Sequence, residues 1–493
     1  MRIPYMHFLG GALVISSIIG SAADWPMRGR DNSRNAVSVE TGAPVQWQLA
    51  ARNRPAQNIF WSTEIGSFNL GDPVVADGLV WVGTNNDHPR DPKRTNDASV
   101  LMCFREADGK FLYQHVSDRL KDGNVFDWWN CGLASSPLVE GDRLWFCNNR
   151  GEVICLDIGA LRSGKGEPRE VWKVDLRKQL GVFLRVPMIA NHAIHCSVAS
   201  YRDLIYVNTT NARQIDGGDK VPAPNAPSLV CFQKHTGKVV WQDNSPGDRI
   251  FDLQHGSPLV IEVKGRTQVI MGQGDGWLRS FDALTGKLIW KFDINFKKDR
   301  HPKRWEGDWN YFMATPVFYG GRVYIGGGRH VEWGDGPGRL CCIDPTKSGD
   351  VSSELEDGPG RGKANPNSAL VWEYLGEGEE RMGRMLASVA IHDDLVIAPD
   401  RRGMIHCLDA RTGAKQWTHD TRASVWCSPL IADGKVYVGD EDGDLVILRL
   451  ARQKVRVAEH NLWSPIYASP VYANGVLYVM TSTHVHAIRA DER

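Results

Sequence analysis

The sequence predicts an all-β protein, an eight-bladed β-propeller built of four-stranded antiparallel blades. Three observations predict it: a repeated set of four short apolar runs joined by tight turns, eight copies of that set, and an incomplete last copy. Residues 388–417 show one complete set, with glycine at two of its turns, Gly403 and Gly413. Runs of strand length joined by such turns are typical of an antiparallel meander.

Each copy opens with a Ser-Pro or related dipeptide, and in seven of the eight an apolar pair begins nine residues later. The fourth copy has a four-residue insertion around Lys264-Gly265. The openings are Asp72-Pro73, Ser136-Pro137, Ser197-Val198, Ser257-Pro258, Thr315-Pro316, Ser388-Val389, Ser428-Pro429 and Ser469-Pro470.

An apolar anchor is expected on the outer strand of each blade. The anchors are Tyr113, Trp172, Trp241, Trp290, Trp372, Trp417 and Val457. The eighth copy ends before its fourth strand, and residues 58–61 are predicted to supply it, because Trp61 precedes Asp72 by the same 11 residues that separate Trp417 from Ser428. An N-terminal strand would thus close the ring and remove its open edge, whereas an open stack of sheets would leave the last sheet unfinished.

The start of the chain is interpreted as a targeting segment. Residues 1–23 combine Arg2, an apolar stretch too short to span a bilayer, and a small-residue cleavage site, as a secretory signal does. The alternative is a buried first strand. Residues 24–57 form a lead-in segment and residues 58–493 the propeller. Since no cysteine precedes Cys103, we expect a soluble periplasmic or secreted protein that is not a lipoprotein.

Charge and composition indicate which classes of binding partner to expect. Acidic and basic residues balance at 58 each, which gives no indication of nucleic-acid binding or membrane insertion. We expect a monomer.

The ten cysteines do not predict a disulfide framework. Five of them (Cys103, Cys155, Cys231, Cys342 and Cys407) occupy one position of the third strand, where a small apolar residue is expected. Cys341-Cys342 is interpreted as strand packing rather than a vicinal disulfide. No role is assigned to Cys131, Cys147, Cys196 and Cys427.

The loops that enter the innermost strands should gather at one mouth of the central channel, and they are rich in aromatic and hydrogen-bonding residues. Such a surface suits a flat or extended ligand, although some of the tryptophans could simply plug the channel. The candidate ligand-binding residues are Trp128, Trp129, Asn130, Arg185, Asp252, His255, Trp309, Asn310, Arg384, Trp426 and Trp463. Two long insertions, residues 212–228 and 345–369, have no assigned role.

Two further motifs are given structural interpretations. The acidic stretch Asp440–Asp444 is similar to a calcium loop but coincides with the hairpin between the second and third strands of its copy. His484 and His486 share one face of the last strand, and two histidines without a third ligand do not make a metal site.

The repeat itself, as in Ser428-Pro429 followed by Tyr437-Val438-Gly439, resembles that of the pyrroloquinoline-quinone-like propellers, which include the quinoprotein alcohol dehydrogenases. The resemblance implies a quinone and Ca²⁺ near the mouth, with Asn211 and Asp252 at the metal, Asp252 also as the base, and Asn211 and Trp309 as cofactor contacts. It also fails at several positions. The vicinal cysteines that cover the quinone are missing from their loop, the stacking tryptophan falls near Ala193, and the basic residue falls near Gly274.

Two hypotheses follow. The first is an exported, non-catalytic propeller that binds a protein, a peptide or a glycan at its aromatic mouth. The second is a divergent pyrroloquinoline-quinone-dependent oxidoreductase of the alcohol or sugar dehydrogenase type, with Asp252 as base and Asn211 near Ca²⁺.

Overall fold

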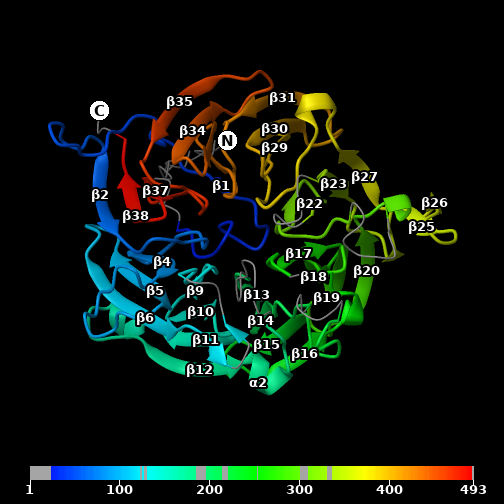
Figure 1. Cartoon of the computed structure of the whole chain (residues 1–493), viewed down its shortest axis with the longest axis horizontal. Coiled ribbons are helices and arrows are strands. Elements are labelled where there is room, and N and C mark those ends of the chain that lie inside the picture. Colours follow the sequence, from blue (N-terminus) through cyan, green and yellow to red (C-terminus); the bar gives the residue numbers. More distant parts are fainter. Residues whose placement is uncertain are drawn as a thin grey trace, which may run out of the picture.

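The computed structural model describes residues 24–122, 125–126, 130–184, 196–213, 220–251, 254–299, 309–329 and 336–490. Eight sheets stand around a central axis, as Figure 1 shows, and each contains a four-stranded antiparallel meander. The meander follows chain order in seven blades, and a strand from the start of the chain completes the eighth. This confirms the predicted eight-bladed propeller.

Blades one to four come from the first half of the chain. Their strands are β3 (Val74–Ala76), β4 (Leu79–Asn85), β5 (Ala98–Arg105) and β6 (Phe111–Asp118); β9 (Leu138–Glu140), β10 (Arg143–Cys147), β11 (Glu152–Asp157) and β12 (Arg169–Asp175); β13 (Ala199–Tyr201), β14 (Leu204–Asn208), β15 (Leu229–Gln233) and β16 (Val239–Asp243); and β17 (Leu259–Val263), β18 (Arg266–Gly272), β19 (Trp277–Asp282) and β20 (Leu288–Asp293).

Blades five to eight follow in the same way. Their strands are β21 (Val317–Tyr319), β22 (Arg322–Gly327), β23 (Arg339–Ile343) and β27 (Leu370–Tyr374); β28 (Ala390–His392), β29 (Leu395–Pro399), β30 (Met404–Asp409) and β31 (Lys415–Asp420); β32 (Leu430–Ala432), β33 (Lys435–Gly439), β34 (Asp444–Arg449) and β35 (Arg456–Asn461); and β36 (Val471–Ala473), β37 (Val476–Met480), β38 (His484–Ile488) and β2 (Ile59–Glu64).

The short remaining elements lie outside these meanders. They are β1 (Val37–Ser38), the pair β7 (Lys121–Asp122) and β8 (Val125–Phe126), β24 (Gly349–Asp350), the pair β25 (Glu354–Glu356) and β26 (Gly362–Ala364), the helices α1 (Gly159–Arg162) and α2 (Leu176–Leu180), and 3-10 turns at Gly247–Arg249, Lys297–Asp299 and Gly378–Glu380. Within the described ranges, no helix has the length and apolar character needed to cross a bilayer.

The N-terminal strand closes the ring as predicted. β2 pairs antiparallel with β38, and Trp61 lies opposite Ala487, in the register that Trp417 has opposite Cys407 in blade six. The five cysteines assigned to one third-strand position all face an outer-strand anchor in this way. Blade seven differs from the prediction by one residue. Ala458 lies opposite Ile447, and Val457 is the extra residue of the β-bulge.

The outer-strand tryptophans join neighbouring blades. The indole N–H of Trp372 in blade five donates to the carbonyl oxygen of Ala410 in blade six (2.9 Å), and its ring lies against Gly413 in the turn between β30 and β31. Trp61, Trp172 and Trp241 bind the following blade in the same manner. A Cβ atom on Gly413 would lie 2.7 Å from the Trp372 ring, so this turn needs glycine for space as well as for its positive φ of 74°.

The opening residue of each repeat has a hydrogen-bonding role. In seven of the eight blades its backbone N–H donates to the side-chain oxygen of the opening residue in the next blade, at 2.8–3.1 Å. The pairs are Ser136 to Ser197, Ser197 to Ser257, Ser257 to Thr315, Thr315 to Ser388, Ser388 to Ser428, Ser428 to Ser469, and Ser469 to Asp72. A hydroxyl or carboxylate is needed there because each N–H is buried near the axis.

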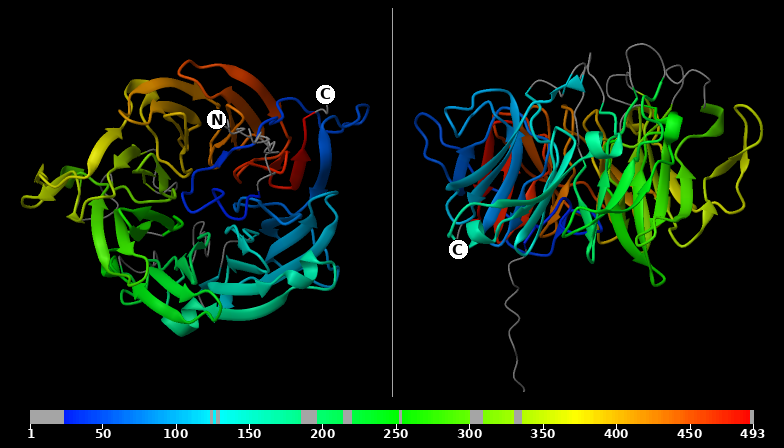
Figure 2. Two further views of the ribbon diagram at one scale, coloured as in Figure 1. Left: turned by 180° about the vertical axis from the view of Figure 1, so that it is seen from behind. Right: turned by 90° about the horizontal axis from the view of Figure 1, so that it is seen from below.

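The lead-in segment crosses one end of the channel. Figure 2 shows it in dark blue across the centre of the disc when the molecule is seen from behind. It hydrogen-bonds to the innermost strand, or the turn after it, of every blade in turn, so the inner sheet edges are covered at this end. The contacts are Trp25 with Val75, Pro26 with Val139, Asn32 with Ser200 and Val260, Ser33 with Phe318, Asn35 with Ile391, Ala36 with Ile431, and Glu40 with Asn474.

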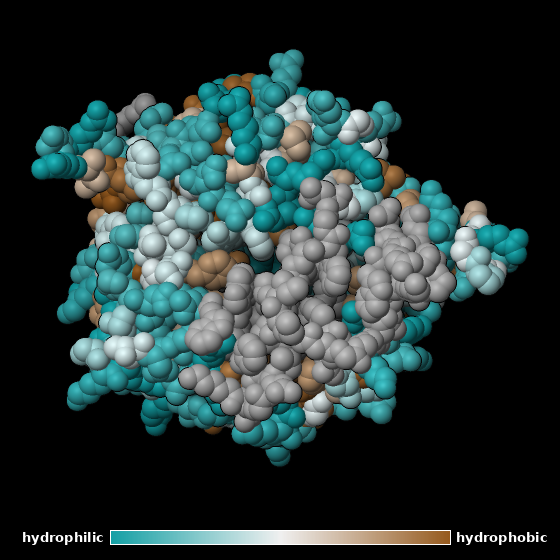
Figure 3. Space-filling model, viewed as in Figure 1, coloured by the Kyte–Doolittle hydropathy of each residue, from teal (hydrophilic) through white to brown (hydrophobic). Residues whose placement is uncertain are grey.

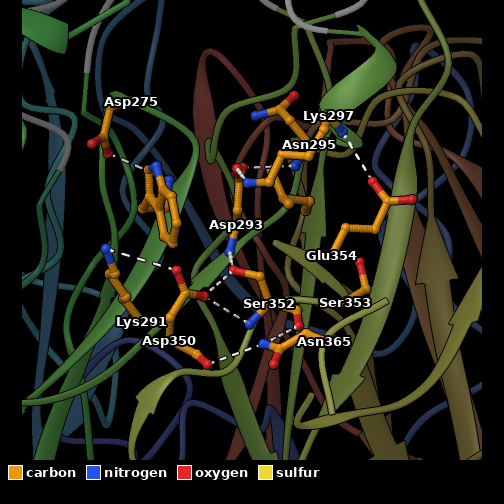
Figure 4. A network of polar contacts seen from close by, with 12 residues as sticks. Asp275, Lys291, Asp293, Asn295, Lys297, Asp350, Ser352, Ser353, Glu354 and Asn365 are labelled. Atoms are coloured by element: carbon orange, nitrogen blue, oxygen red, sulfur yellow. Dashed lines mark hydrogen bonds and ion pairs between the residues drawn. The ribbon is translucent and has the colours of Figure 1, made fainter. Parts of the chain in front are cut away.

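The insertion at 345–369 in blade five is ordered and packs on blade four. β24 pairs parallel with β20, the outer strand of blade four. Figure 4 shows the polar contacts: Ser352 Oγ accepts the backbone N–H of Asp293 (3.0 Å), and Asn365 Nδ2 donates to the carbonyl oxygen of Ser352 (2.9 Å). The buried pair of Lys297 Nζ and Asp293 Oδ2, 2.7 Å apart, lies beside them. The insertion therefore covers an outer sheet edge.

Candidate functional site

Two arginines of the lead-in segment form the closed floor of the channel. Arg34 is buried and donates to the carbonyl oxygens of Pro258 (3.0 Å), Ser197 (3.2 Å) and Val198 (3.1 Å). Burial lowers its pKa to about 10. Arg28 is different, because its side chain keeps 20% exposure and its Nε lies 3.6 Å from Asp72 Oδ2. The Arg34 guanidinium thus binds the lead-in segment to the inner strands, and the Arg28 guanidinium faces the channel.

Above this floor lies a small axial funnel. Its cavity of about 70 Å³ is lined by the cation Arg28, the polar residues His255 and Thr315, and the apolar or aromatic residues Leu70, Met313, Leu386, Trp426 and Tyr467. Figure 3 shows a hollow near the centre of the opposite face, with hydrophilic residues along part of its border. The funnel therefore combines an apolar wall with a cation at its base.

Trp426 is the best-supported aromatic of this wall. The ring of Tyr467 meets it edge-on at 5.7 Å, and the Arg401 guanidinium lies over it at 4.4 Å. Glu441 accepts from Tyr467 (3.5 Å) and pairs with Arg401 (3.4 Å). A ring held on two sides by residues that are themselves bound is a fixed surface for stacking.

The structure brings together only some of the predicted mouth residues. His255 and Trp426 line the funnel, and Arg384 is buried in the loop that enters blade six. Asn130 is exposed, with its carbonyl oxygen bound to Asn85 Nδ2 (2.7 Å). Trp128, Trp129, Arg185 and Asp252 lie outside the described residues.

Two of the remaining candidates, Trp309 and Asn310, lie in the loop before blade five and make contacts that position it. The ring of Trp309 stacks on Phe251 (5.8 Å between centroids, 16° between planes), and the backbone of Asn310 is bound by the Asn295 side chain in both directions. Trp463 lines another pocket, near the blade rim, together with Trp47. The predicted mouth is thus spread over more than one surface.

The predicted calcium ligand Asn211 has a structural role in the described part of the chain. Asn211 is fully buried, with its Oδ1 accepting the Phe183 N–H (3.0 Å) and its Nδ2 donating to Ala223 (2.9 Å), so its amide already holds two loops together. No group of three or more His, Cys, Asp or Glu side chains in the described parts of the chain is placed to hold a metal ion. Asp252, the other residue predicted near the ion, lies outside the described residues.

The cysteines form no disulfide. All ten are free and buried. Cys341 and Cys342 lie on β23, where they face Glu373 and Trp372 respectively, and burial raises the pKa of Cys342 to about 12. Cys147 and Cys196 pack together between blades two and three, and their mutual hydrogen bond and burial raise the pKa of Cys147.

Two carboxylates at the same hairpin position differ sharply in their surroundings. Asp400, in blade six, is buried, and its Oδ2 accepts from the Gly383 N–H (2.7 Å) and lies 3.5 Å from His406 Nε2. Burial alone would raise its pKa, but His406 and the Gly383 N–H outweigh that effect and lower it. Asp440, in blade seven, is equally buried, and no described residue binds its Oδ2.

Asp440 therefore holds its proton more tightly than Asp400 does. Burial raises its pKa to about 6, despite the N–H groups of Asp442 and Asp444 that its Oδ1 accepts at 3.1 and 3.0 Å. The acidic stretch is a hairpin turn, as predicted. Repeat alignment could have identified the unusual carboxylate, because His406 has Val446 as its counterpart in blade seven.

The two C-terminal histidines are part of the ring closure. Their rings stack at 5.5 Å, and His486 Nδ1 lies 2.9 Å from the Ser62 Oγ of β2. Burial, with the neighbouring His484, lowers the pKa of His486 to about 4.

Sequence comparisons give quinoprotein and assembly-factor relatives. The chain is 37% identical to the quinoprotein ethanol dehydrogenase of Pseudomonas putida over 351 residues, 64% of this chain and 52% of the relative. It is 32% identical to that of Pseudomonas aeruginosa over 63% of this chain and 51% of the relative. An outer membrane protein assembly factor BamB from Moranella endobia is 23% identical over 53% and 60%. The chain spans about half the length of these two dehydrogenases.

Solved structures share the fold at low identity. BamB from Moraxella catarrhalis superposes with a TM-score of 0.54 and 14% identity, covering 88% of this chain and 98% of that one. The quinohemoprotein alcohol dehydrogenase from Comamonas testosteroni gives 0.58 and 13%, covering 96% and 81%.

The family model described as outer membrane protein assembly factor BamB matches residues 165–360 and 363–492, more than half of the chain. Together with the repeat and the closed ring of eight blades, this match shows that the chain belongs to the pyrroloquinoline-quinone-like β-propeller family.

Proposed function

We propose that this chain is an exported, non-catalytic propeller that binds a protein, peptide or glycan segment in its axial funnel. The observation that carries the proposal is the funnel itself, in which Arg28 reaches the base of a wall formed by Trp426, Tyr467 and Leu386. A concave, mostly apolar surface with one fixed charge suits the end of an extended ligand. Export is supported by the signal-like pattern of residues 1–23.

Arg28 favours a ligand that ends in an anionic group. Its only described carboxylate partner is Asp72, at 3.6 Å, and Asp72 also accepts the Ser469 N–H (2.8 Å). The charge of Arg28 is thus only partly compensated. A carboxylate in the funnel would add a second charge-assisted hydrogen bond to the same guanidinium.

Binding is tested with Trp426→Ala and Arg28→Gln in the mature chain. Peptides with free or amidated C-termini and oligosaccharides with or without a carboxylate serve as probes, and affinity is measured by calorimetry. We expect both variants to weaken binding, and Arg28→Gln to weaken it only for the carboxylate form. Binding that neither variant changes would refute the funnel as the site.

A divergent quinoprotein oxidoreductase is the second candidate, and the 37% identity to an ethanol dehydrogenase favours it. The bound quinone would supply the two-electron oxidant, with Asp252, Asn211 and Trp309 the residues proposed to contact it or its Ca²⁺. The buried and doubly bonded amide of Asn211 speaks against this assignment.

One titration separates the two candidates. Pyrroloquinoline quinone with Ca²⁺ is added to the mature chain, while tryptophan quenching and dye-coupled alcohol oxidation are followed. Saturable quenching with turnover that Asp252→Asn abolishes would replace the non-catalytic proposal. The binding proposal predicts no turnover at micromolar quinone.

A further inference from the structure

A second pocket lies on the rim of the propeller, away from the axis. After crossing the channel, the lead-in segment forms a small hairpin in which the backbones of Gln48 and Gln57 pair in both directions. Figure 1 shows this hairpin in dark blue beside β2. The hairpin is fixed to blade seven, because the Trp47 ring packs against His460 (4.1 Å between centroids, 33° between planes) and His460 Nε2 donates to the Val45 carbonyl oxygen (2.9 Å).

The space between hairpin and blade is large enough for a ligand. Its cavity of about 180 Å³ exceeds the axial one of about 70 Å³. The residues of its lining that matter here are Trp47, Gln48, Arg54, His460, Asn461 and Trp463. No carboxylate belongs to this lining in the part of the chain that the structure describes.

Trp463 is held outward at the edge of this pocket. It is 83% exposed, and its backbone has a positive φ of 61°. Asn461 fixes this turn, since its Oδ1 accepts the Trp463 N–H (2.7 Å) while its Nδ2 is bound to Asp444 Oδ1 (2.9 Å). The backbone that carries the indole is therefore fixed, while the indole itself is not packed in a core.

Blade six shows that the turn itself does not require a tryptophan. Arg422 occupies the corresponding place after β31, with a φ of 67° and with its N–H bound to Asp420 Oδ1 (2.8 Å). The same turn thus accepts a charged residue that water solvates well. Exposing an indole instead leaves a large apolar surface in water, which is unfavourable unless something covers it.

Polar groups suited to hydroxyls lie beside the exposed ring. No side-chain bond of Arg54 to another described residue is found, and Gln48 uses one amide hydrogen on the Pro55 carbonyl oxygen (3.1 Å). The guanidinium fork and the remaining amide groups can therefore donate to and accept from a ligand. An exposed aromatic face with planar hydrogen-bonding groups at its edge matches a pyranose ring, which has C–H groups on one face and hydroxyls around its rim.

We propose that this rim pocket is an oligosaccharide-binding site, with Trp463 as the stacking platform and Arg54 and Gln48 as hydroxyl or carboxylate partners. A β-strand peptide fits less well, because the hairpin backbone at Gln48 and Gln57 is already paired. The site is independent of the axial funnel, so the two proposals can fail separately.

The test uses the full mature chain and three probes: cellohexaose, chitohexaose and hexagalacturonate. Affinity is measured by calorimetry and by fluorescence for wild type, Trp463→Ala, Trp463→Tyr, Arg54→Gln and the control Arg422→Ala. We expect Trp463→Ala to weaken binding by roughly tenfold or more, as loss of a central aromatic contact does. Trp463→Tyr should recover part of it, and Arg422→Ala should bind like wild type.

The two neutral sugars and the uronate distinguish the role of Arg54. A larger loss for hexagalacturonate on Arg54→Gln indicates an acidic glycan, and an equal loss for all indicates hydroxyl recognition. The proposal is overturned if none of the probes binds at millimolar concentration, or if Trp463→Ala leaves affinity unchanged. A loss on Trp426→Ala with none on Trp463→Ala would place the sugar in the funnel and overturn the rim site.

Discussion

Replacing Asp440 by asparagine should stabilise the protein, although it removes a buried residue of a regular hairpin. The carboxylate is buried, and no described residue binds its Oδ2, so the charged form is held in an unfavourable place. Asparagine has the shape of the protonated acid. Its Oδ1 can keep the N–H bonds of Asp442 and Asp444.

The pKa of Asp440 determines how large the stability gain of Asp440→Asn should be and in which pH range it should appear. Burial raises it from 3.8 to about 6 in the folded protein, so the folded state binds the proton more tightly than the unfolded chain. The cost of ionisation is therefore complete above pH 6 and disappears as the pH falls toward 3.8. It amounts to about 3 kcal/mol. We expect Asp440→Asn to gain about 1–3 kcal/mol at pH 8 and almost nothing at pH 4.

Asp400→Asn is the matched control, because it changes the same hairpin position in the preceding blade. Asp400 Oδ2 accepts the Gly383 N–H at 2.7 Å and the Arg402 guanidinium at 3.1 Å. An amide nitrogen placed there would face donors. We expect a loss of about 2–4 kcal/mol at pH 8.

Urea unfolding followed by tryptophan fluorescence at pH 4, 6 and 8 measures both changes. We expect the two chemically identical substitutions to change the free energy of unfolding in opposite directions at pH 8. If Asp440→Asn is destabilising at pH 8 to the same degree as Asp400→Asn, the unbound carboxylate oxygen is not the cause of the raised pKa.

Other substitutions test the contacts that join the blades, each by urea unfolding. Gly413→Ala should cost about 2–5 kcal/mol, because it combines positive-φ strain with a Cβ 2.7 Å from Trp372. The control Gly434→Ala, at a φ of 67° with open space around it, should cost about 1–2 kcal/mol. Equal losses would show that the contact with Trp372 does not contribute to the cost. Ser428→Ala should cost about 1–3 kcal/mol, because it leaves the buried N–H of the preceding blade without its acceptor, and an unchanged midpoint would contradict this. His486 contributes the opposite pH dependence to Asp440, because between pH 6.5 and 4 the unfolded chain takes up a proton that buried His486, with a pKa of about 4, does not. Over this range the wild type should therefore lose up to about 3 kcal/mol relative to His486→Gln, and an equal change in both proteins would contradict this.

The fold could be predicted from sequence because its determinants repeat. The Ser-Pro opening marks residues such as Ser388 and Ser428, whose hydroxyls accept an N–H from the preceding blade, and the tryptophan anchors mark contacts with the following blade. Each is a local pattern with a fixed spacing. The Val457 error has the same origin, because a β-bulge adds one residue that spacing alone does not reveal.

The sites were harder to predict because they depend on contacts between residues far apart in sequence. His255 and Trp426 were expected at the mouth, but nothing near Arg28 indicates that it lies beneath them. The position of Trp463 in a loop predicts that it lies at the mouth. In the structure it lines the rim pocket together with the lead-in residue Trp47. Residues 24–57 lie outside the repeats, so the repeat pattern does not predict the path of this segment.

That course links the fold to both proposed sites. The segment hydrogen-bonds to all eight blades, supplies Arg28 to the base of the funnel, and then reaches blade seven, where Trp47 packs against His460. The rim hairpin is continuous with the segment that crosses the channel. A ligand that binds the hairpin and blade seven together would therefore also hold this segment in place. Since a ligand that binds only the folded state stabilises it, occupation of the rim pocket should strengthen closure of the channel floor. The same segment therefore covers one end of the channel and contributes residues to both proposed sites.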